Sequence, residues 1–320
     1  MTDVIYRADE ALRGRRLGLG CAQLGDLFEP LDDRAATDVV EAAWGAGIRY
    51  FDTAPHYGLG LSEQRLGAAL RGLPRSEFVV STKVGRLIRP HVGRDTDVRG
   101  SKARGYDRVW DFSRDGVLRS LEESLERLGL DSVDIVLMHD VGDRFQEAVE
   151  QAVPALAELR DQGVIRAIGA GDGNADTLTR FVTEADIDVV LEAGRYTLLD
   201  RTAERDLFPA CRHRGVSVIA AGVFNTGLLA TPEPGPGARF EYVEADEQSL
   251  KAARAMAATC RTYGAELPAA ALQFALREPA VGTVLVGAET PDQIRQAASR
   301  MAAPLPTELW HDLDVSERGS

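Results

Sequence analysis

The sequence is poor in cysteine and has no long apolar run. Its three cysteines, Cys21, Cys211 and Cys260, are widely separated, and none forms a C-x-x-C pair. This number and spacing argue against a disulfide framework or a zinc site and fit a reducing compartment. The longest apolar stretches, such as VDIVLM, are far shorter than the roughly 20 residues that span a bilayer. The first residues carry charges throughout and do not resemble a signal peptide, so we expect a cytoplasmic protein without a metal.

Positive charge is also in short supply. Lys plus Arg number 37 against 50 for Asp plus Glu, which gives a net charge of −13. Nucleic acids and anionic membranes both require a cationic face, so neither is an expected partner. The sequence also lacks a G-x-G-x-x-G motif between a strand and a helix, which argues against a Rossmann-type dinucleotide site. A small-molecule substrate is therefore the expected partner.

The sequence does contain a regular alternation of short apolar runs with longer segments of helical period. Several helical segments end in glycine, as at Gly129 and Gly215. Alternation of this kind predicts a parallel sheet wrapped by helices. Eight strand-helix units match a (β/α)8 TIM barrel of the α/β class, with an open doubly wound sheet as the alternative, and we expect one domain over residues 1–320. The predicted strands lie at 16–22, 49–54, 78–84, 133–140, 165–171, 189–194, 216–222 and 283–288.

Two long segments interrupt this rhythm. Residues 85–112 and 224–246 are longer than an ordinary connection between a strand and a helix, and the second contains TPEPGPGAR. Loops of this length in a compact domain are usually functional. Both follow predicted strands, so we expect them at the C-terminal face of the barrel, where barrel active sites lie.

Four polar residues stand at the ends of three consecutive predicted strands. Asp52 and Tyr57 lie in FDTAPHYG, Lys83 lies in STKV and His139 lies in LMHD. Each alone has an ordinary structural explanation, but together they fall where barrel enzymes place their chemistry. Hydride transfer at a carbonyl carbon needs a group that gives or takes a proton at oxygen. We expect Tyr57 in this role, with its pKa lowered by Lys83, Lys83 held by Asp52, and His139 donating a hydrogen bond to the reacting oxygen.

Several segments resemble the signature regions of the aldo-keto reductases. They are FDTAPHYG, VVSTKVG and LMHD, and IRAIG and VLVGAETPDQI extend the similarity over nearly the whole chain. GRYTLLD, AAGVFNTGLLA and LPAAALQFALREP further resemble the sugar 1-dehydrogenase branch of that family. Its members oxidise L-fucose, D-arabinose and related aldoses to lactones, and the branch includes pyridoxal 4-dehydrogenase. The resemblance implies an NAD(P)-dependent aldose 1-dehydrogenase. The alternatives are a reductase of aldehydes or ketones, a pyridoxal 4-dehydrogenase, and a non-catalytic cofactor-sensing subunit like the potassium-channel β subunits that share this fold.

The same resemblance implies a nicotinamide cofactor across the barrel mouth. Relatives that prefer NADP usually carry Lys and Arg where this chain has Gly287 and Gln293, and the acidic Glu289 lies between these two positions. We therefore expect a preference for NAD over NADP, with Arg295 as the phosphate ligand in the alternative case. The expected cofactor contacts are Gly20, Ala22, Asp52, Gly171, Asp172, Glu192, Gly222, Phe224, Gly227, Leu228, Val286, Gly287, Ala288, Glu289, Gln293 and Gln296.

The chain departs from many relatives near the nicotinamide ring. It has Gly171-Asp172 in place of Ser-Asn, Ala193 in place of Gln, and Ala221 in place of an aromatic residue. A sugar site needs polar groups for the hydroxyls and an aromatic group for the ring face. The expected substrate contacts are Cys21, Gln23, His56, Tyr57, Trp110 and His139, with Asp26, Arg195, Tyr106 and Phe224 as further candidates.

Overall fold

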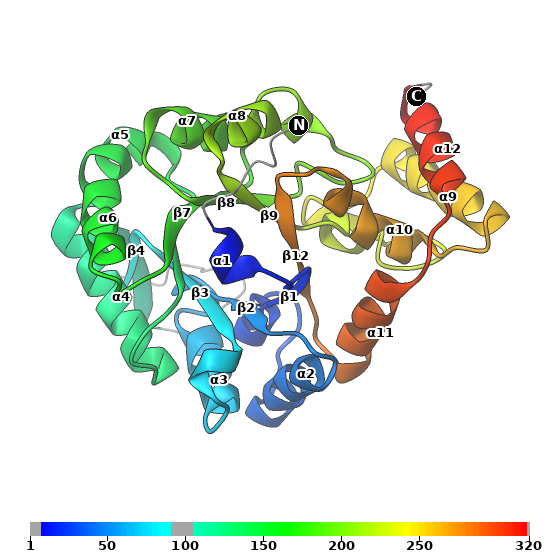
Figure 1. Cartoon of the computed structure of the whole chain (residues 1–320). Helices are drawn as coiled ribbons and strands as arrows, with labels where there is room; N and C mark the ends of the chain where they lie inside the picture. The colour runs from blue at the N-terminus through cyan, green and yellow to red at the C-terminus, as the bar shows by residue number, and fades with distance from the viewer. Residues whose placement is uncertain (1–7, 91–104, 319–320) are drawn as a thin grey trace.

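The barrel predicted from the sequence is present. The computed structural model describes residues 8–90 and 105–318, and its eight parallel strands close in the order β1, β12, β9, β8, β7, β6, β3 and β2 (Figure 1). All eight strands begin and end within two residues of the expected ranges. The strands are β1 (Leu17–Gly20), β2 (Tyr50–Asp52), β3 (Val79–Val84), β6 (Ile135–His139), β7 (Ala167–Asp172), β8 (Val189–Ala193), β9 (Ser217–Ala221) and β12 (Val281–Gly287).

Helices cover the outside of the barrel, and their ends follow local sequence rules. α2 begins after Asp32, whose carboxylate accepts a hydrogen bond from Ala35 N, and α4 ends at Gly129 in the left-handed conformation. Within residues 8–90 and 105–318, no helix is both long and apolar enough to cross a membrane. The helices are α2 (Asp33–Gly45), α3 (Leu61–Leu70), α4 (Arg114–Leu128), α5 (Phe145–Glu147), α6 (Val153–Asp161), α7 (Ala175–Glu184), α8 (Leu207–Arg214), α9 (Glu247–Thr262), α10 (Leu267–Phe274), α11 (Pro291–Ala302) and α12 (Thr307–Arg318).

The barrel interior and the layer between strands and helices form two separate apolar cores. Side chains alternate along each strand, so every second residue points into the barrel. The short helix α1 (Asp9–Leu12) lies across the centre of the ring of strands in Figure 1 and packs Ala8, Ala11 and Leu12 against the inner core. This helix closes the N-terminal end of the barrel and leaves the C-terminal mouth for the site. The inner core contains Tyr50, Val79, Ile135, Leu137, Ala167, Val189, Leu191, Ile219 and Leu285.

The segment 85–112, expected to be one long loop, contains an antiparallel hairpin instead. β4 (Arg86–Pro90) pairs with β5 (Tyr106–Trp110). Leu87 and Val109 face each other across the two strands, an apolar pair of the kind that stabilises a hairpin. Residues 91–104 lie outside the described part of the chain.

The segment 224–246 crosses the barrel mouth, and we call it the strap. Tyr242 stacks on Phe28 in the connection after β1, with ring centroids 6.2 Å apart. Glu241 forms an ion pair with Arg195 in the connection after β8. The strap therefore ties three connections together at the C-terminal face, where the sequence predicted it. Its elements are the 3-10 turn η6 (Asn225–Gly227) and a short hairpin of β10 (Arg239–Phe240) and β11 (Val243–Glu244).

Candidate active site

Eight inward positions ring the mouth where the barrel strands end, and they divide into a polar half and a small half. Each lies two residues after a residue that points into the barrel, so its own side-chain position also faces inward. The polar half holds Asp52, Lys83 and His139, at the ends of the neighbouring strands β2, β3 and β6. The small half has no atom beyond Cβ at any position and consists of Gly20, Gly171, Ala193, Ala221 and Gly287.

The small half fits a flat cofactor ring. A Cβ atom at Gly20 would meet nothing closer than 3.7 Å, and one at Gly171 would first meet Lys83 Cε at 3.6 Å. A Cβ atom at either position would therefore fit beside the charged side chains without a clash, whereas one at Gly287 would clash with the Gln23 amide. The residues present fit a nicotinamide ring lying against the reactive groups, which is the placement that hydride transfer requires.

A buried chain of hydrogen bonds connects the polar residues. Lys83 Nζ donates to Asp52 Oδ2 at 2.7 Å, to Thr53 O at 3.0 Å and to Tyr57 Oη at 3.0 Å. Ser81 Oγ donates to the second carboxylate oxygen of Asp52 at 2.6 Å. Lys83 is 1% exposed and Asp52 is 3% exposed, so water does not screen this pair. The order Asp52, Lys83, Tyr57 is the one that the sequence predicted.

Burial dominates the acid–base properties of Tyr57. Loss of solvation raises the pKa of Tyr57 to about 12, although the Lys83 ammonium acts in the opposite direction. Burial by itself lowers the pKa of Lys83, but Asp52 and Tyr57 together raise it above its ordinary value. The expectation of a lowered Tyr57 pKa is therefore wrong in its net direction. At neutral pH Tyr57 is protonated and Lys83 is charged.

Three aromatic side chains meet at the polar half of the mouth. The rings of Tyr57 and His139 lie edge to face with centroids 5.7 Å apart, and the His56 ring lies 5.6 Å from that of His139. His139 is 7% exposed, burial lowers its pKa, and its Nδ1 has no hydrogen-bond partner among the described residues. The His139 ring is therefore neutral at working pH, and a neutral imidazole has one N–H to donate.

Two arginines of the β4–β5 hairpin also reach the polar half of the mouth, and neither is among the residues predicted from the sequence. Arg86 donates to Asp140 Oδ2 at 2.6 Å and stacks on Trp110, with 4.2 Å between Arg86 Cζ and the ring centroid. Arg108 donates to His56 Nδ1 at 2.8 Å. Charged residues in a polar loop are usually solvated, which is why neither was singled out. The signal that could have found them is the apolar, β-branched and aromatic residues in RLI and RVW, which favour strands.

Several expected substrate contacts have other positions or roles. Cys21 is fully buried in the outer core, and its thiol donates to a backbone carbonyl, so its assignment to the substrate pocket is wrong. Asp26 and Arg195 are both engaged in ion pairs that support the loops of the mouth. Gln23 does lie at the mouth, but its amide covers Gly287 on β12, across the barrel from His139.

Three expected cofactor contacts point away from the mouth. Glu192 follows the inward residue Leu191 and so faces outward, where it is fully buried and accepts a hydrogen bond from Arg195 N at 2.8 Å. Burial raises the pKa of Glu192 to about 8. Val286 and Ala288 belong to the outer core for the same reason. These three assignments are wrong as side-chain contacts, because a shift of one residue along a strand reverses the face.

The connections after β7 and β9 give a mixed result. Leu228 is fully buried in the outer core and its N–H donates to Asn225 O at 3.3 Å, so its assignment to the cofactor is wrong. The N–H of Gly227 donates to Phe224 O at 3.0 Å. The pKa of Asp172 is raised to about 6 by burial and by Asp140. The candidates that remain at the rim are Ala22, Asp172, Gly222, Phe224 and Gly227.

The segment expected to hold the adenosine end of the cofactor forms the start of α11. Gln293 Oε1 accepts hydrogen bonds from the backbone N–H groups of Glu289, at 2.6 Å, and Thr290, at 3.2 Å. Together with the Thr290 side chain these bonds form a capping box. Gln293 is therefore engaged in capping the helix and brings no charge. Gln296 lies exposed nearly one turn further along α11.

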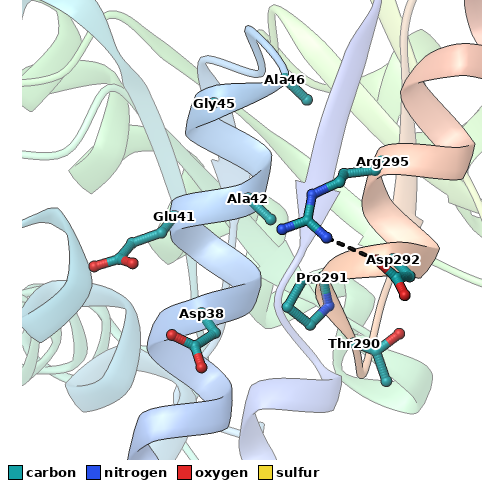
Figure 2. A pocket seen from close by; sticks show the side chains of 9 residues that line it. All are labelled: Asp38, Glu41, Ala42, Gly45, Ala46, Thr290, Pro291, Asp292 and Arg295. Carbon is teal, nitrogen blue, oxygen red and sulfur yellow. Dashed lines mark hydrogen bonds and ion pairs between the residues drawn. The ribbon is translucent and has the colours of Figure 1, made fainter.

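A groove between α2 and α11 contains the alternative phosphate ligand (Figure 2). Arg295 projects into this groove and donates to Asp292 Oδ1 at 2.7 Å. Asp38 and Glu41 line the α2 side. Arg295 is therefore already paired with a carboxylate, in an acidic groove outside the barrel.

This chain is similar to a family profile and to known proteins from several organisms. The profile of the aldo/keto reductase family matches residues 16–317. The chain is 47% identical over 303 residues to D-threo-aldose 1-dehydrogenase from a Pseudomonas species, covering 93% of this chain and 92% of that relative. It is 38% identical over 317 residues to pyridoxal 4-dehydrogenase from Microbacterium luteolum, again covering 93% and 92%. Among solved structures it is similar to the holo form of an aldo-keto reductase from Bacillus halodurans, with a TM-score of 0.75, 27% identity, and coverage of 94% and 91%.

Proposed function

Because this chain belongs to the aldo/keto reductase family, we propose that it oxidises the anomeric carbon of an aldose to a lactone with NAD. The chain is an oxidoreductase that acts on a small molecule, and enzymes of this family use NAD(P)H. The 47% identity to a D-threo-aldose 1-dehydrogenase supports an aldose such as L-fucose or D-arabinose as substrate. The observation that carries the proposal is the buried chain of Asp52, Lys83 and Tyr57 beside His139.

The four side chains have separate roles in the proposed reaction. The small half of the mouth would hold an oxidised nicotinamide, which would supply the hydride acceptor for the anomeric carbon. Tyr57 Oη takes the proton of the reacting hydroxyl, and the Lys83 ammonium 3.0 Å away stabilises the phenolate. Asp52 keeps Lys83 charged and in place. His139 donates its N–H to the substrate oxygen and thereby orients the substrate.

Oxidation should accelerate as the pH rises. Only deprotonated Tyr57 accepts a proton, and with a pKa of about 12 this form increases up to about tenfold per pH unit below that value. Reduction uses the protonated form, which already predominates at neutral pH, so its rate should stay flat there. Initial rates at saturating substrate, measured in both directions at constant ionic strength, test this. A flat oxidation profile between about pH 6 and about pH 10 would contradict Tyr57 as the base.

The surroundings of the mouth favour a polyhydroxylated substrate. Arg86, Asp140, Arg108 and His56 bring hydrogen-bonding groups to the site of Tyr57 and His139, and a sugar pairs its hydroxyls with such groups. Trp110, which is 38% exposed, offers an aromatic face. The same Trp110 favours an aromatic aldehyde as the second candidate, in line with the 38% identity to pyridoxal 4-dehydrogenase.

A substrate screen separates the two candidates. NAD reduction is followed at alkaline pH over a panel of aldoses, with L-fucose and D-arabinose among them, and over pyridoxal. Turnover of an aldose with a lactone as product supports the proposal. Turnover of pyridoxal alone overturns it in favour of the second candidate.

We also propose that the enzyme prefers NAD over NADP. Gly287 has no side chain, Gln293 brings no charge, and Glu289 is partly buried beside a second carboxylate, Glu29. Burial and Glu29 raise the pKa of Glu289, while the nearby Arg239 lowers it. A 2′-phosphate would therefore meet two carboxylates and one neighbouring cation in this region, which is unfavourable.

The cofactor preference has a direct measurement. We expect kcat/KM with NAD to exceed that with NADP by about 10- to 100-fold, since each 1.4 kcal/mol of discrimination is worth about tenfold. Glu289→Ala should reduce the ratio of kcat/KM with NAD to kcat/KM with NADP, because it removes a carboxylate that repels the 2′-phosphate. Glu308→Ala, which removes an exposed carboxylate on α12, is the matched control and should leave the ratio unchanged. Equal kcat/KM for the two cofactors would contradict the proposal, and loss of NADP activity in Arg239→Ala would identify Arg239 as a phosphate ligand.

A further inference from the structure

His56 lies beside the proposed acid–base pair, although the chemistry described above does not use it. Its ring centroid is 5.6 Å from that of His139 and 6.3 Å from that of Tyr57, with interplanar angles of 89° and 66°. His56 is half-buried at the mouth. A substrate whose reacting oxygen lies between Tyr57 and His139 therefore has His56 as its next neighbour.

Arg108 is the hydrogen-bond partner of the His56 ring. Arg108 NH1 lies 2.8 Å from His56 Nδ1 and 3.2 Å from Nε2. A guanidinium group only donates, so the ring nitrogen that it binds carries no proton. Nδ1 is the nearer of the two ring nitrogens, and in the tautomer in which Nδ1 accepts from Arg108 the single proton of the neutral ring lies on Nε2. Burial, together with Arg86 and Arg108, lowers the pKa of His56 to about 3, so the ring stays neutral.

Arg108 is an unusual residue to use as a purely structural support. It makes no ion pair with any carboxylate in residues 8–90 and 105–318, whereas Arg86 next to it pairs with Asp140 at 2.6 Å. Burial and the like charge of Arg86 lower the pKa of Arg108. Placing a partly buried cation against a neutral ring and a second cation costs free energy. Such an arrangement is expected where the orientation of the ring serves the reaction.

We propose that His56, held in its Nε2–H form by Arg108, donates a hydrogen bond to the substrate oxygen on the carbon next to the reacting carbon. For an aldose oxidised at the anomeric carbon, this oxygen is the 2-hydroxyl, so this form of the proposal rests on the proposed function. His139 then binds the reacting oxygen, and His56 binds the oxygen on the adjacent carbon. His56 is the residue that determines specificity at this position, and Arg108 is a positioning residue that acts through it.

Pairs of substrates with and without the neighbouring hydroxyl test this assignment. kcat/KM is measured for an accepted aldose and for its 2-deoxy analogue in wild type and in His56→Ala. We expect the substitution to lower kcat/KM for the hydroxylated sugar by about 10- to 100-fold, and for the 2-deoxy sugar by less than about threefold. His56→Gln keeps an N–H donor and should recover part of the discrimination. An equal loss on both sugars would overturn the proposal.

Arg108 variants test the positioning role. Arg108→Ala should reduce the ratio of kcat/KM values between the two sugars nearly as much as His56→Ala, and Arg108→Lys, which keeps a donor, should restore part of it. Arg89→Ala is the matched control, because Arg89 lies on the other strand of the same hairpin and pairs with Glu123. It should leave the ratio unchanged. A ratio that Arg108→Ala does not alter would overturn the role of Arg108.

A second substrate pair separates this proposal from the sugar assignment. Reduction of glycolaldehyde and acetaldehyde compares an aldehyde that carries a neighbouring hydroxyl with one that lacks it. If no aldose is oxidised but His56→Ala selectively slows glycolaldehyde reduction, the proposed function fails and the role of His56 stands. If aldoses are oxidised but His56→Ala slows the substrates with and without the neighbouring hydroxyl equally, the role of His56 is wrong and the proposed function stands.

Discussion

Tyr57→Phe is expected to lower kcat by about 10³- to 10⁴-fold in both directions, because it removes the only hydroxyl that Lys83 binds within residues 8–90 and 105–318. The phenyl ring keeps the packing against His139, whose centroid lies 5.7 Å away. Cofactor affinity should therefore stay within about twofold of wild type. Steady-state turnover with the best substrate and titration of cofactor binding by fluorescence measure the two quantities.

The control for this substitution is Tyr263→Phe. It removes a hydroxyl that donates to Asp312 on the outer helices, and it should leave kcat unchanged. Unchanged turnover in Tyr57→Phe would contradict a catalytic Tyr57. Cofactor binding without turnover in the wild-type protein would instead favour the cofactor-sensing, non-catalytic alternative.

Asp52→Asn is expected to have the largest effect on stability. It leaves the Lys83 ammonium, which is 1% exposed, without its anionic partner at 2.7 Å. Removing one partner of a buried ion pair costs about 3 to 5 kcal/mol. The substitution should also lower kcat, because Lys83 is then less firmly charged beside Tyr57. Urea unfolding at neutral pH measures the first effect, and turnover measures the second.

A double variant distinguishes an unpaired charge from a general loss of packing. Asp52→Asn combined with Lys83→Met removes both charges and should recover most of the lost stability, whereas its kcat should remain at the level of an inactive enzyme. If the free energy of unfolding of Asp52→Asn equals that of the wild type, the ion pair between Asp52 and Lys83 does not stabilise the fold as described. Equal instability of the single and double variants would assign the loss to packing.

The sequence predicted the barrel well, and it predicted which polar residues lie together at the barrel mouth, for physical reasons. Parallel strands buried on both faces give continuous apolar runs, and the boundaries of all eight lie within two residues of the expected positions. Asp52, Lys83 and His139 come together because neighbouring parallel strands end at the same edge of the sheet. Residues that end such strands in the sequence therefore lie close together in the fold.

The remainder of the site depends on facts that a linear pattern does not contain. Glu192 was assigned to the wrong face because neighbouring residues on a strand differ in direction, and the direction is set by the closed barrel. The pKa of Tyr57 was expected to fall because charges can be counted from the sequence, whereas burial depends on the folded structure. Arg86 and Arg108 reach the mouth only because β4 pairs with β5, and this pairing is not evident from the sequence.

The helix that closes the bottom of the barrel has a consequence for biosynthesis. Ala8 N donates to Ser217 Oγ at 3.3 Å, and β1 pairs along β12, so the earliest described residues find these partners only after most of the chain has been translated. Until β12 emerges from the ribosome, β1 has an open edge that can pair with a strand of another molecule. The nascent chain, rather than the finished enzyme, is therefore the form most in need of protection from aggregation.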